Sequence, residues 1–171
     1  MGKTEIIFNV QMAMGVLWMS LVARWYVLPK LYTLPFHNAL VPLLLVAVLR
    51  FHGLNFMVPE NNNALSEAFA VPAGYGDFAV CLIALSAAIA CRMRSSVGPM
   101  LAWLYAVVGT LDFMMGFYLG DAAKMPYHLG ATWFMVIQEA PLQILALFCL
   151  FRVLLKHPQK RAAAVPAAVK T

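Results

Sequence analysis

Four ionisable side chains stand inside segments that are otherwise apolar: Arg50, Asp77, Asp112 and Glu139. A charge in a hydrocarbon environment is costly unless it is paired or reaches water, so such residues mark candidate functional sites. Neighbouring carboxyl groups can divide acid and base roles between them. We therefore expect acid–base chemistry, with Asp112 and Glu139 as the acid–base pair, Asp77 as a third catalytic carboxyl group, and Arg50 orienting them or binding an anionic group.

The four residues fall at a similar depth in four different predicted helices. At 1.5 Å per residue, each lies roughly 9–18 Å from the same end of its helix. A structural ion pair between Arg50 and one acid is the competing interpretation, and it accounts for one carboxylate rather than three. Three acids against one arginine leave an excess of negative charge. The sequence therefore predicts that some acids are protonated, that a cation shares the site, or that water reaches it.

Polar residues near these four extend the candidate site. In the last apolar segment His128, Thr132, Glu139 and Gln143 are spaced by four, seven and four residues, which places them on one helical face. We expect this face to line a cavity. His128 and Gln143 are therefore candidate ligand-binding residues.

The second apolar segment is polar on two sides. His52 is two residues from Arg50 and would point to a nearly opposite face of an α-helix, with Asn55 on the His52 side. This pattern favours a central position for the helix. His52 and Asn55 are further candidate ligand-binding residues, and the alternative for His52 is a structural histidine held by hydrogen bonds.

Cofactor patterns are weak in this sequence. Haem b needs axial ligands at matching depth, whereas His128 would lie nearer the surface than His52 and His37 near the other surface. Di-iron sites use Glu-x-x-His pairs, and the sequence has none. A divalent metal would need one of these histidines with two of the acids, and no local spacing supports this. The cofactor is left unassigned.

Composition indicates the elements that must position these residues. The chain is 63% hydrophobic and 11% charged, far more apolar than a soluble domain. Inside a bilayer the backbone must satisfy its own hydrogen bonds, so the sequence predicts an all-α transmembrane bundle. We expect one domain over residues 1–156, followed by a basic, disordered cytoplasmic tail over 157–171. The predicted spans are about 6–26, 36–58, 71–90, 98–120 and 127–151.

The distribution of basic residues predicts the orientation. Nine lysines and arginines fall on the side of the C-terminus and two on the side of the N-terminus. The positive-inside rule then gives an N-out, C-in topology, in a bacterial inner membrane or its equivalent. The net charge of +5 is dispersed rather than clustered, so a nucleic-acid partner is not expected.

The combined pattern predicts a protein that binds or converts a small lipid-soluble or amphiphilic ligand. An acid–base enzyme of the isomerase or cyclase kind is one form of this hypothesis. The alternative is a proton- or cation-coupled transporter, or an accessory subunit of a membrane complex. A homo-oligomer is compatible with either.

Overall fold

The computed structural model describes residues 2–157, and within that range it is helical without any strand. Five of its helices are long and apolar enough to cross a membrane, as the sequence predicts. Residues 158–171 of the predicted tail lie outside the described residues. The five are Lys3–Thr33, Phe36–Met57, Glu67–Arg92, Gly98–Ala122 and Thr132–Lys156.

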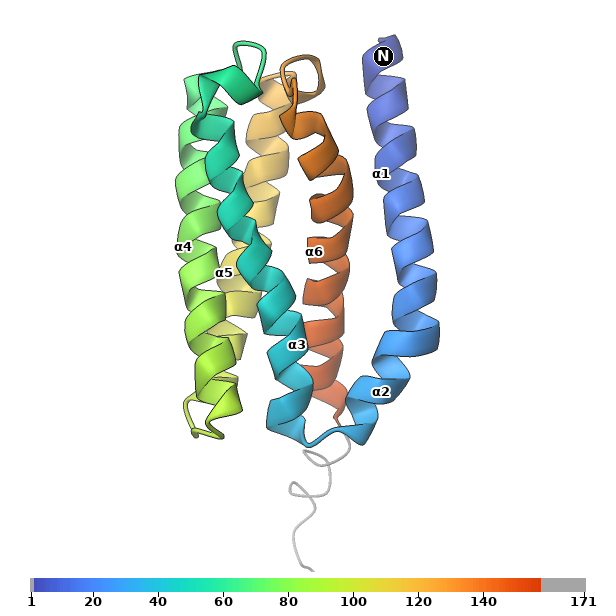
Figure 1. Cartoon of the computed structure of the whole chain (residues 1–171), viewed down its shortest axis with the longest axis vertical. Coiled ribbons are helices and arrows are strands. Elements are labelled where there is room, and N and C mark those ends of the chain that lie inside the picture. Colours follow the sequence, from blue (N-terminus) through green and yellow to red (C-terminus); the bar gives the residue numbers. More distant parts are fainter. Residues whose placement is uncertain (1, 158–171) are drawn as a thin grey trace, which may run out of the picture.

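The long helices run alternately up and down the bundle (Figure 1). The first is built from three consecutive elements, with a π-helical turn, η1, in the middle. The second begins as an α-helix and ends as a 3₁₀-helix, η2. The elements are α1 (Lys3–Val22), η1 (Ala23–Val27), α2 (Leu28–Thr33), α3 (Phe36–Val48), η2 (Leu49–Met57), η3 (Pro59–Asn61), α4 (Glu67–Arg92), α5 (Gly98–Ala122), η4 (Met125–Tyr127) and α6 (Thr132–Lys156).

The two ends of the bundle carry opposite charge. The end that holds the N-terminus and the loops around η3 and η4, here named the acidic end, contains Glu5, Glu60, Glu67 and Asp121 beside Lys3 and Lys124. The opposite end, here named the basic end, has no acidic residue within the described chain. Its charged residues are Arg24, Lys30, Arg92, Arg94, Arg152 and Lys156.

The half of the bundle nearer the basic end is a closely packed apolar core. Leu44 of α3, Ala84 of α4, Ala106 of α5 and Leu150 of α6 are fully buried there. Alanines at such positions let helix backbones approach closely, which is how helices pack in lipid. A second apolar cluster, including Phe56, Phe69 and Leu129, lies near the acidic end. The charged residues of the predicted site lie between the two clusters.

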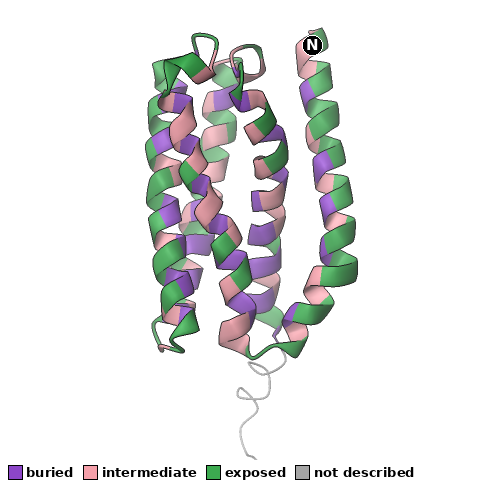
Figure 2. Ribbon diagram, viewed as in Figure 1, coloured by how far each residue is buried: buried purple, intermediate pink, exposed green. Residues whose placement is uncertain are grey.

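The helix α1 is peripheral and packs mainly along α6 (Figures 1 and 2). Their contact centres on Gly15, where a Cβ atom would lie 2.8 Å from Pro141 Cγ and 3.4 Å from the Ile137 carbonyl oxygen. Pro141 has no N–H, so that carbonyl lacks its usual helical partner. The Trp133 indole also donates a 2.9 Å hydrogen bond to Gln11. Only glycine allows α1 to approach this closely.

The last helix begins later than the sequence predicts. Tyr127 belongs to the short helix η4 and His128 to a turn, and α6 begins at Thr132. Gly130 interrupts the helix because its φ of +53° is left-handed. The expected span of about 127–151 is therefore present as Thr132–Lys156, five residues later at each end.

Replacing Gly15 with leucine should separate α1 from α6. The new side chain would overlap Pro141, and overpacking of this kind costs roughly 1–3 kcal/mol. We expect the thermal midpoint in detergent to fall by several degrees, followed through tryptophan emission, to which Trp133 at this interface contributes. Ala13→Leu, on an exposed face of the same helix, should leave the midpoint unchanged. Equal midpoints for Gly15→Leu and Ala13→Leu would contradict close packing at Gly15.

Candidate functional site

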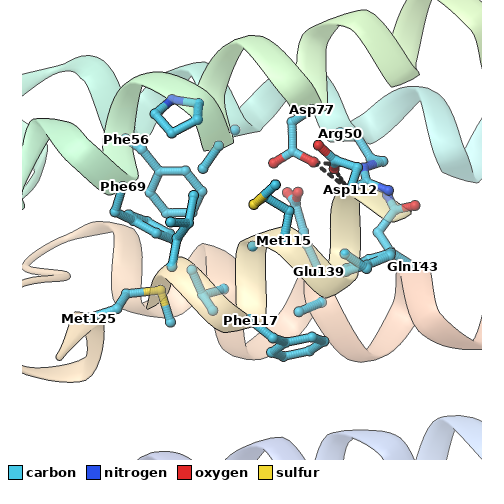
Figure 3. A pocket seen from close by; sticks show the side chains of 18 of the residues that line it. Arg50, Phe56, Phe69, Asp77, Asp112, Met115, Phe117, Met125, Glu139 and Gln143 are labelled. Carbon is cyan, nitrogen blue, oxygen red and sulfur yellow. Dashed lines mark hydrogen bonds and ion pairs between the residues drawn. The ribbon is translucent and has the colours of Figure 1, made fainter. Parts of the chain in front are cut away.

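Arg50 joins three elements of the bundle through ion pairs. Its side chain is 4% exposed and leaves η2 between α4 and α5. Arg50 Nε donates to Asp77 Oδ1 at 2.7 Å, and Nη2 lies 2.6 Å from the same oxygen. Nη2 also donates to Asp112 Oδ2. The predicted proximity of Arg50 to two of the acids is therefore present in the fold (Figure 3).

The remaining surface of the guanidinium also faces protein groups. Arg50 Nη1 donates to the Gly109 carbonyl oxygen at 3.3 Å. The Phe113 ring lies 4.2 Å from the guanidinium carbon, which is cation–π contact. All three guanidinium nitrogens thus donate to groups of α4 or α5. Arg50 holds these two helices against η2.

Two glycines allow the acids to reach Arg50. A Cβ atom on Gly53 of η2 would overlap the Asp77 side chain, at 2.6 Å from its Cβ and 2.8 Å from its Cγ. A Cβ atom on Gly76 of α4 would overlap the Asp112 carboxylate. Glycine at these positions gives the carboxylates room where two backbones approach closely. Both glycines are therefore part of the site although they carry no functional group.

The third acid has a different partner from the other two. Glu139 Oε1 of α6 is hydrogen-bonded to His52 Nδ1 of η2. The two side chains are 24% and 34% exposed, so this pair is less enclosed than Arg50. The sequence places all three acids around Arg50, whereas the structure divides them between Arg50 and His52.

The 3₁₀ form of η2 sets the angle between the Arg50 and His52 side chains. At three residues per turn, Arg50 and His52 diverge by about 120°, compared with about 160° in an α-helix. Arg50 therefore points between α4 and α5, while His52 points toward α6. A 3₁₀ run of nine residues is unusually long, and it begins directly before Arg50.

Gln143 of α6 donates a hydrogen bond to the backbone just before η2, and its side-chain oxygen has no hydrogen-bond partner in the described chain. Its Nε2 donates a 2.9 Å hydrogen bond to the Val46 carbonyl oxygen. Its Oε1 is buried without a hydrogen-bond partner among residues 2–157. The residue is 3% exposed and lines the cavity described next. A buried carbonyl oxygen without a partner is costly, so an acceptor is available here for a bound molecule.

These groups meet at one side of a cavity between η2, α4, α5 and α6. Its empty volume is about 810 Å³, including space open to the outside. Asp77, Asp112, Glu139 and Gln143 gather at one side, and Phe56, Phe69 and Met125 lie at the other (Figure 3). The lining residues nearest the open face include Met115 and Phe117, which are 54% and 53% exposed. The cavity is therefore polar at one end and apolar along the rest.

Two predicted ligand-binding residues make other contacts. His128 Nδ1 is 2.9 Å from the Asn63 carbonyl oxygen and joins two loops at the acidic end. Asn55 Nδ2 lies 3.7 Å from Sδ of Met135, which lines the cavity. Neither His128 nor Asn55 is itself among the residues that line the cavity, and His52 is not either, although it contacts the lining residue Glu139. The predicted face from His128 to Gln143 is wrong at its start, because Gly130 ends the helical spacing there.

Sequence reasoning missed Tyr105, which lies beneath Arg50. Its side chain is almost fully buried, and a Cβ atom on Gly109 would lie 3.3 Å from its ring and 3.5 Å from Arg50 Nη1. The sequence did contain a signal. Tyr105, Gly109, Asp112 and Gly116 are spaced by four, three and four residues, which is one face of an α-helix.

The described residues contain no group of three or more His, Cys, Asp or Glu side chains arranged to hold a metal ion. Asp77 and Asp112 share Arg50, and Glu139 is paired with His52. The chemistry that these side chains offer directly is hydrogen bonding and proton transfer.

Replacing Arg50 with methionine should destabilise the protein strongly. Two carboxylates would lose their cation, and breaking a buried pair in this way costs about 3–5 kcal/mol. Adding Asp77→Asn and Asp112→Asn to the same chain should restore part of that loss. Unfolding with SDS in mixed micelles, followed by circular dichroism, measures the difference. Arg92→Met at the exposed basic end is the control. A triple variant no more stable than Arg50→Met would contradict a stabilising ion pairing of Arg50 with Asp77 and Asp112.

The close contacts at Gly53 and Gly76 predict how alanine substitutions change stability. Gly53→Ala and Gly76→Ala should each lower stability, because the added methyl group meets Asp77 or Asp112. Gly116→Ala should be neutral or slightly stabilising, since no atom lies within 4 Å of its Cβ position. The same SDS titration distinguishes them. Three equal midpoints would show that the carboxylates do not occupy these positions.

One of the comparisons with known proteins finds a match. Residues 7–155 match the family model described as Domain of unknown function (DUF8737). No curated protein and no solved structure matches the chain. The match includes every residue of the cavity and all five long helices apart from the first four residues of the first and the last residue of the fifth, and the chain belongs to this family.

Proposed function

We propose that this chain is a multi-pass membrane protein that binds a small amphiphile in the cavity and acts on its polar end by proton transfer. The observation that carries the proposal is the cavity itself. It has five polar side chains at one end, those of Arg50, Asp77, Asp112, Glu139 and Gln143, and aromatic and methionine side chains along the rest. Such a site matches a molecule with one polar end and one apolar chain.

Insertion in a membrane is supported by the outward faces of the helices. Large apolar side chains such as Leu17, Leu111, Met114 and Phe134 are exposed around the bundle. Exposure on this scale would be unfavourable in water. The basic end would lie on the cytoplasmic side by the positive-inside rule. The chain would then be oriented N-out and C-in, in a bacterial inner membrane or its equivalent.

Access to the cavity would be lateral, from the bilayer. Met115 and Phe117 line the cavity and are also half-exposed on the outer side of α5. Between them, the Cβ position of Gly116 meets no atom within 4 Å. An apolar chain could pass between α5 and α6 here without crossing water. Lateral entry suits a ligand that is dissolved in lipid.

Glu139 and His52 would form the proton-transfer pair. Each belongs to a different element, they are hydrogen-bonded, and both retain partial exposure. Asp112 and Asp77 are held by Arg50 and would serve to fix the geometry around the pair. Moving a proton from one atom of a ligand to another needs no further reactant. An isomerase- or cyclase-like reaction therefore fits these residues.

The apolar core at the basic end favours this proposal over transport. Leucine, alanine and valine side chains of α3, α4, α5 and α6 fill it closely, and the buried polar atoms of this half, on His37, Arg152 and His157, lie near the ends of α3 and α6. A coupled transporter would need polar groups along a path to the basic end. The cavity is continuous with the acidic-end half of the bundle and stops at Gln143 and Arg50.

Filling the cavity should remove the bound molecule. Ala140 lines it, and Ala140→Phe would place a ring in the space. Native mass spectrometry of protein extracted in mild detergent should show an amphiphile adduct on the wild type that is lost in this variant. Ala79→Phe, on an exposed face of α4, should keep the adduct. Absence of any adduct from the wild type would overturn the proposed function.

If Glu139 transfers a proton, the wild type and a Glu139 variant should release chemically different ligands. Any ligand that copurifies with Glu139→Gln should be unconverted, because an amide cannot accept the proton. The molecule released from this variant should then differ in chromatographic retention from that released by the wild type. Glu60→Gln, an exposed residue at the acidic end, is the matched control. The same molecule from all three proteins would restrict the function to binding.

A further inference from the structure

We propose that the polar end of the ligand is a cation, such as a protonated amine. This inference rests on the proposed function, since it names the class of amphiphile that the same cavity would take. Two independent observations lead to it: the charges of the cavity wall and the hydrogen-bonding capacity left free there.

The charges that line the cavity do not balance. Three carboxyl groups face it, from Asp77, Asp112 and Glu139, and one guanidinium, from Arg50. Arg50 is paired with both aspartates, while Glu139 has only His52. Uncompensated negative charge away from water is unfavourable, and a cationic group in the cavity would reduce it.

The unpartnered atoms of Gln143 and Glu139 at the cavity wall are hydrogen-bond acceptors. Arg50 already donates from all three nitrogens to Asp77, Asp112 and Gly109. Gln143 donates its amide to Val46, which leaves Oε1 as a buried acceptor without a partner in the described chain. His52 contacts only one of the two Glu139 oxygens, Oε1. A ligand that donates hydrogen bonds fits these atoms, and a purely accepting ligand does not.

An anionic head group is disfavoured by the same contacts. It would enter beside three carboxyl groups, and Arg50, the one arginine near them within residues 2–157, is already enclosed by Asp77, Asp112 and the Phe113 ring. An ammonium group has three donors and no acceptor, so it can contact Glu139 and Gln143 together. Its apolar chain would then extend along Leu119 toward Phe56, Phe69 and Met125.

The test compares three photoactivatable probes that share a twelve-carbon chain with a diazirine and differ only in the head group: ammonium, hydroxyl or carboxylate. Each is added to the full chain in phosphatidylcholine nanodiscs, and labelled peptides are quantified by mass spectrometry. Labelling of α1, whose Leu17 is exposed and lies outside the cavity, corrects for different partition into lipid. Cavity labelling is read on the peptides around Gly116 and Met135.

We expect the ammonium probe to label the cavity peptides at concentrations at least about tenfold lower than the other two, because its hydrogen bonds to the Glu139 carboxylate are charge-assisted. The preference should disappear in Glu139→Gln and persist in Glu60→Gln. The comparison of head groups is made first on the wild type. It therefore tests the cationic head group even if Glu139→Gln does not fold.

The other outcomes separate this inference from the proposed function. Equal labelling of the cavity by the three probes, or preferred labelling by the carboxylate, would overturn the cationic head group and leave an amphiphile pocket in place. Labelling of α1 alone by every probe would overturn the proposed function, and this inference with it.

Discussion

The ion pairs of Arg50 with Asp77 and Asp112 determine how four helices can be arranged around the cavity. A guanidinium that is 4% exposed requires partners on every side. The carboxylates supply two of them, the Gly109 carbonyl a third and the Phe113 ring a fourth. Because these partners come from α4 and α5, Arg50 draws both helices toward η2. The absence of side chains on Gly53 and Gly76 makes that approach sterically possible.

The change from α-helix to 3₁₀-helix at Leu49 gives one short segment two functions. Arg50 faces α4 and α5, and His52 faces Glu139 on α6. Gln143 stabilises the point of change by donating to the Val46 carbonyl. Glu139 and Gln143 are four residues apart on α6, so they contact η2 and its start from the same face. Positions of cavity residues on α6 are thus coupled to the conformation of η2.

The division between a rigid half and an open half suits a binding site. Alanine-rich packing between α3, α4 and α5 makes the basic half a compact support. Toward the acidic end α5 and α6 leave space at Gly116, and the wall consists of flexible methionines and flat aromatic rings. Methionine side chains adapt to ligands of different shape. The charged groups lie where the compact half ends, so they are held firmly while the apolar part of the cavity remains adaptable.

Hydropathy was enough to predict the helical class and the five long helices, because it depends on local composition. The positions of the charged residues along those helices followed from the regular rise of an α-helix. The spacing of Glu139 and Gln143 also sufficed to place both on the cavity. Which acid meets which base depends on how the helices pack. The 3₁₀ form of η2 changes the angle between Arg50 and His52, and Gly130 removes His128 from the face of α6. Tyr105 and the aromatic wall became part of the site only through the contact of α5 with η2 and α6, since pairing between helices depends on packing that no single segment encodes.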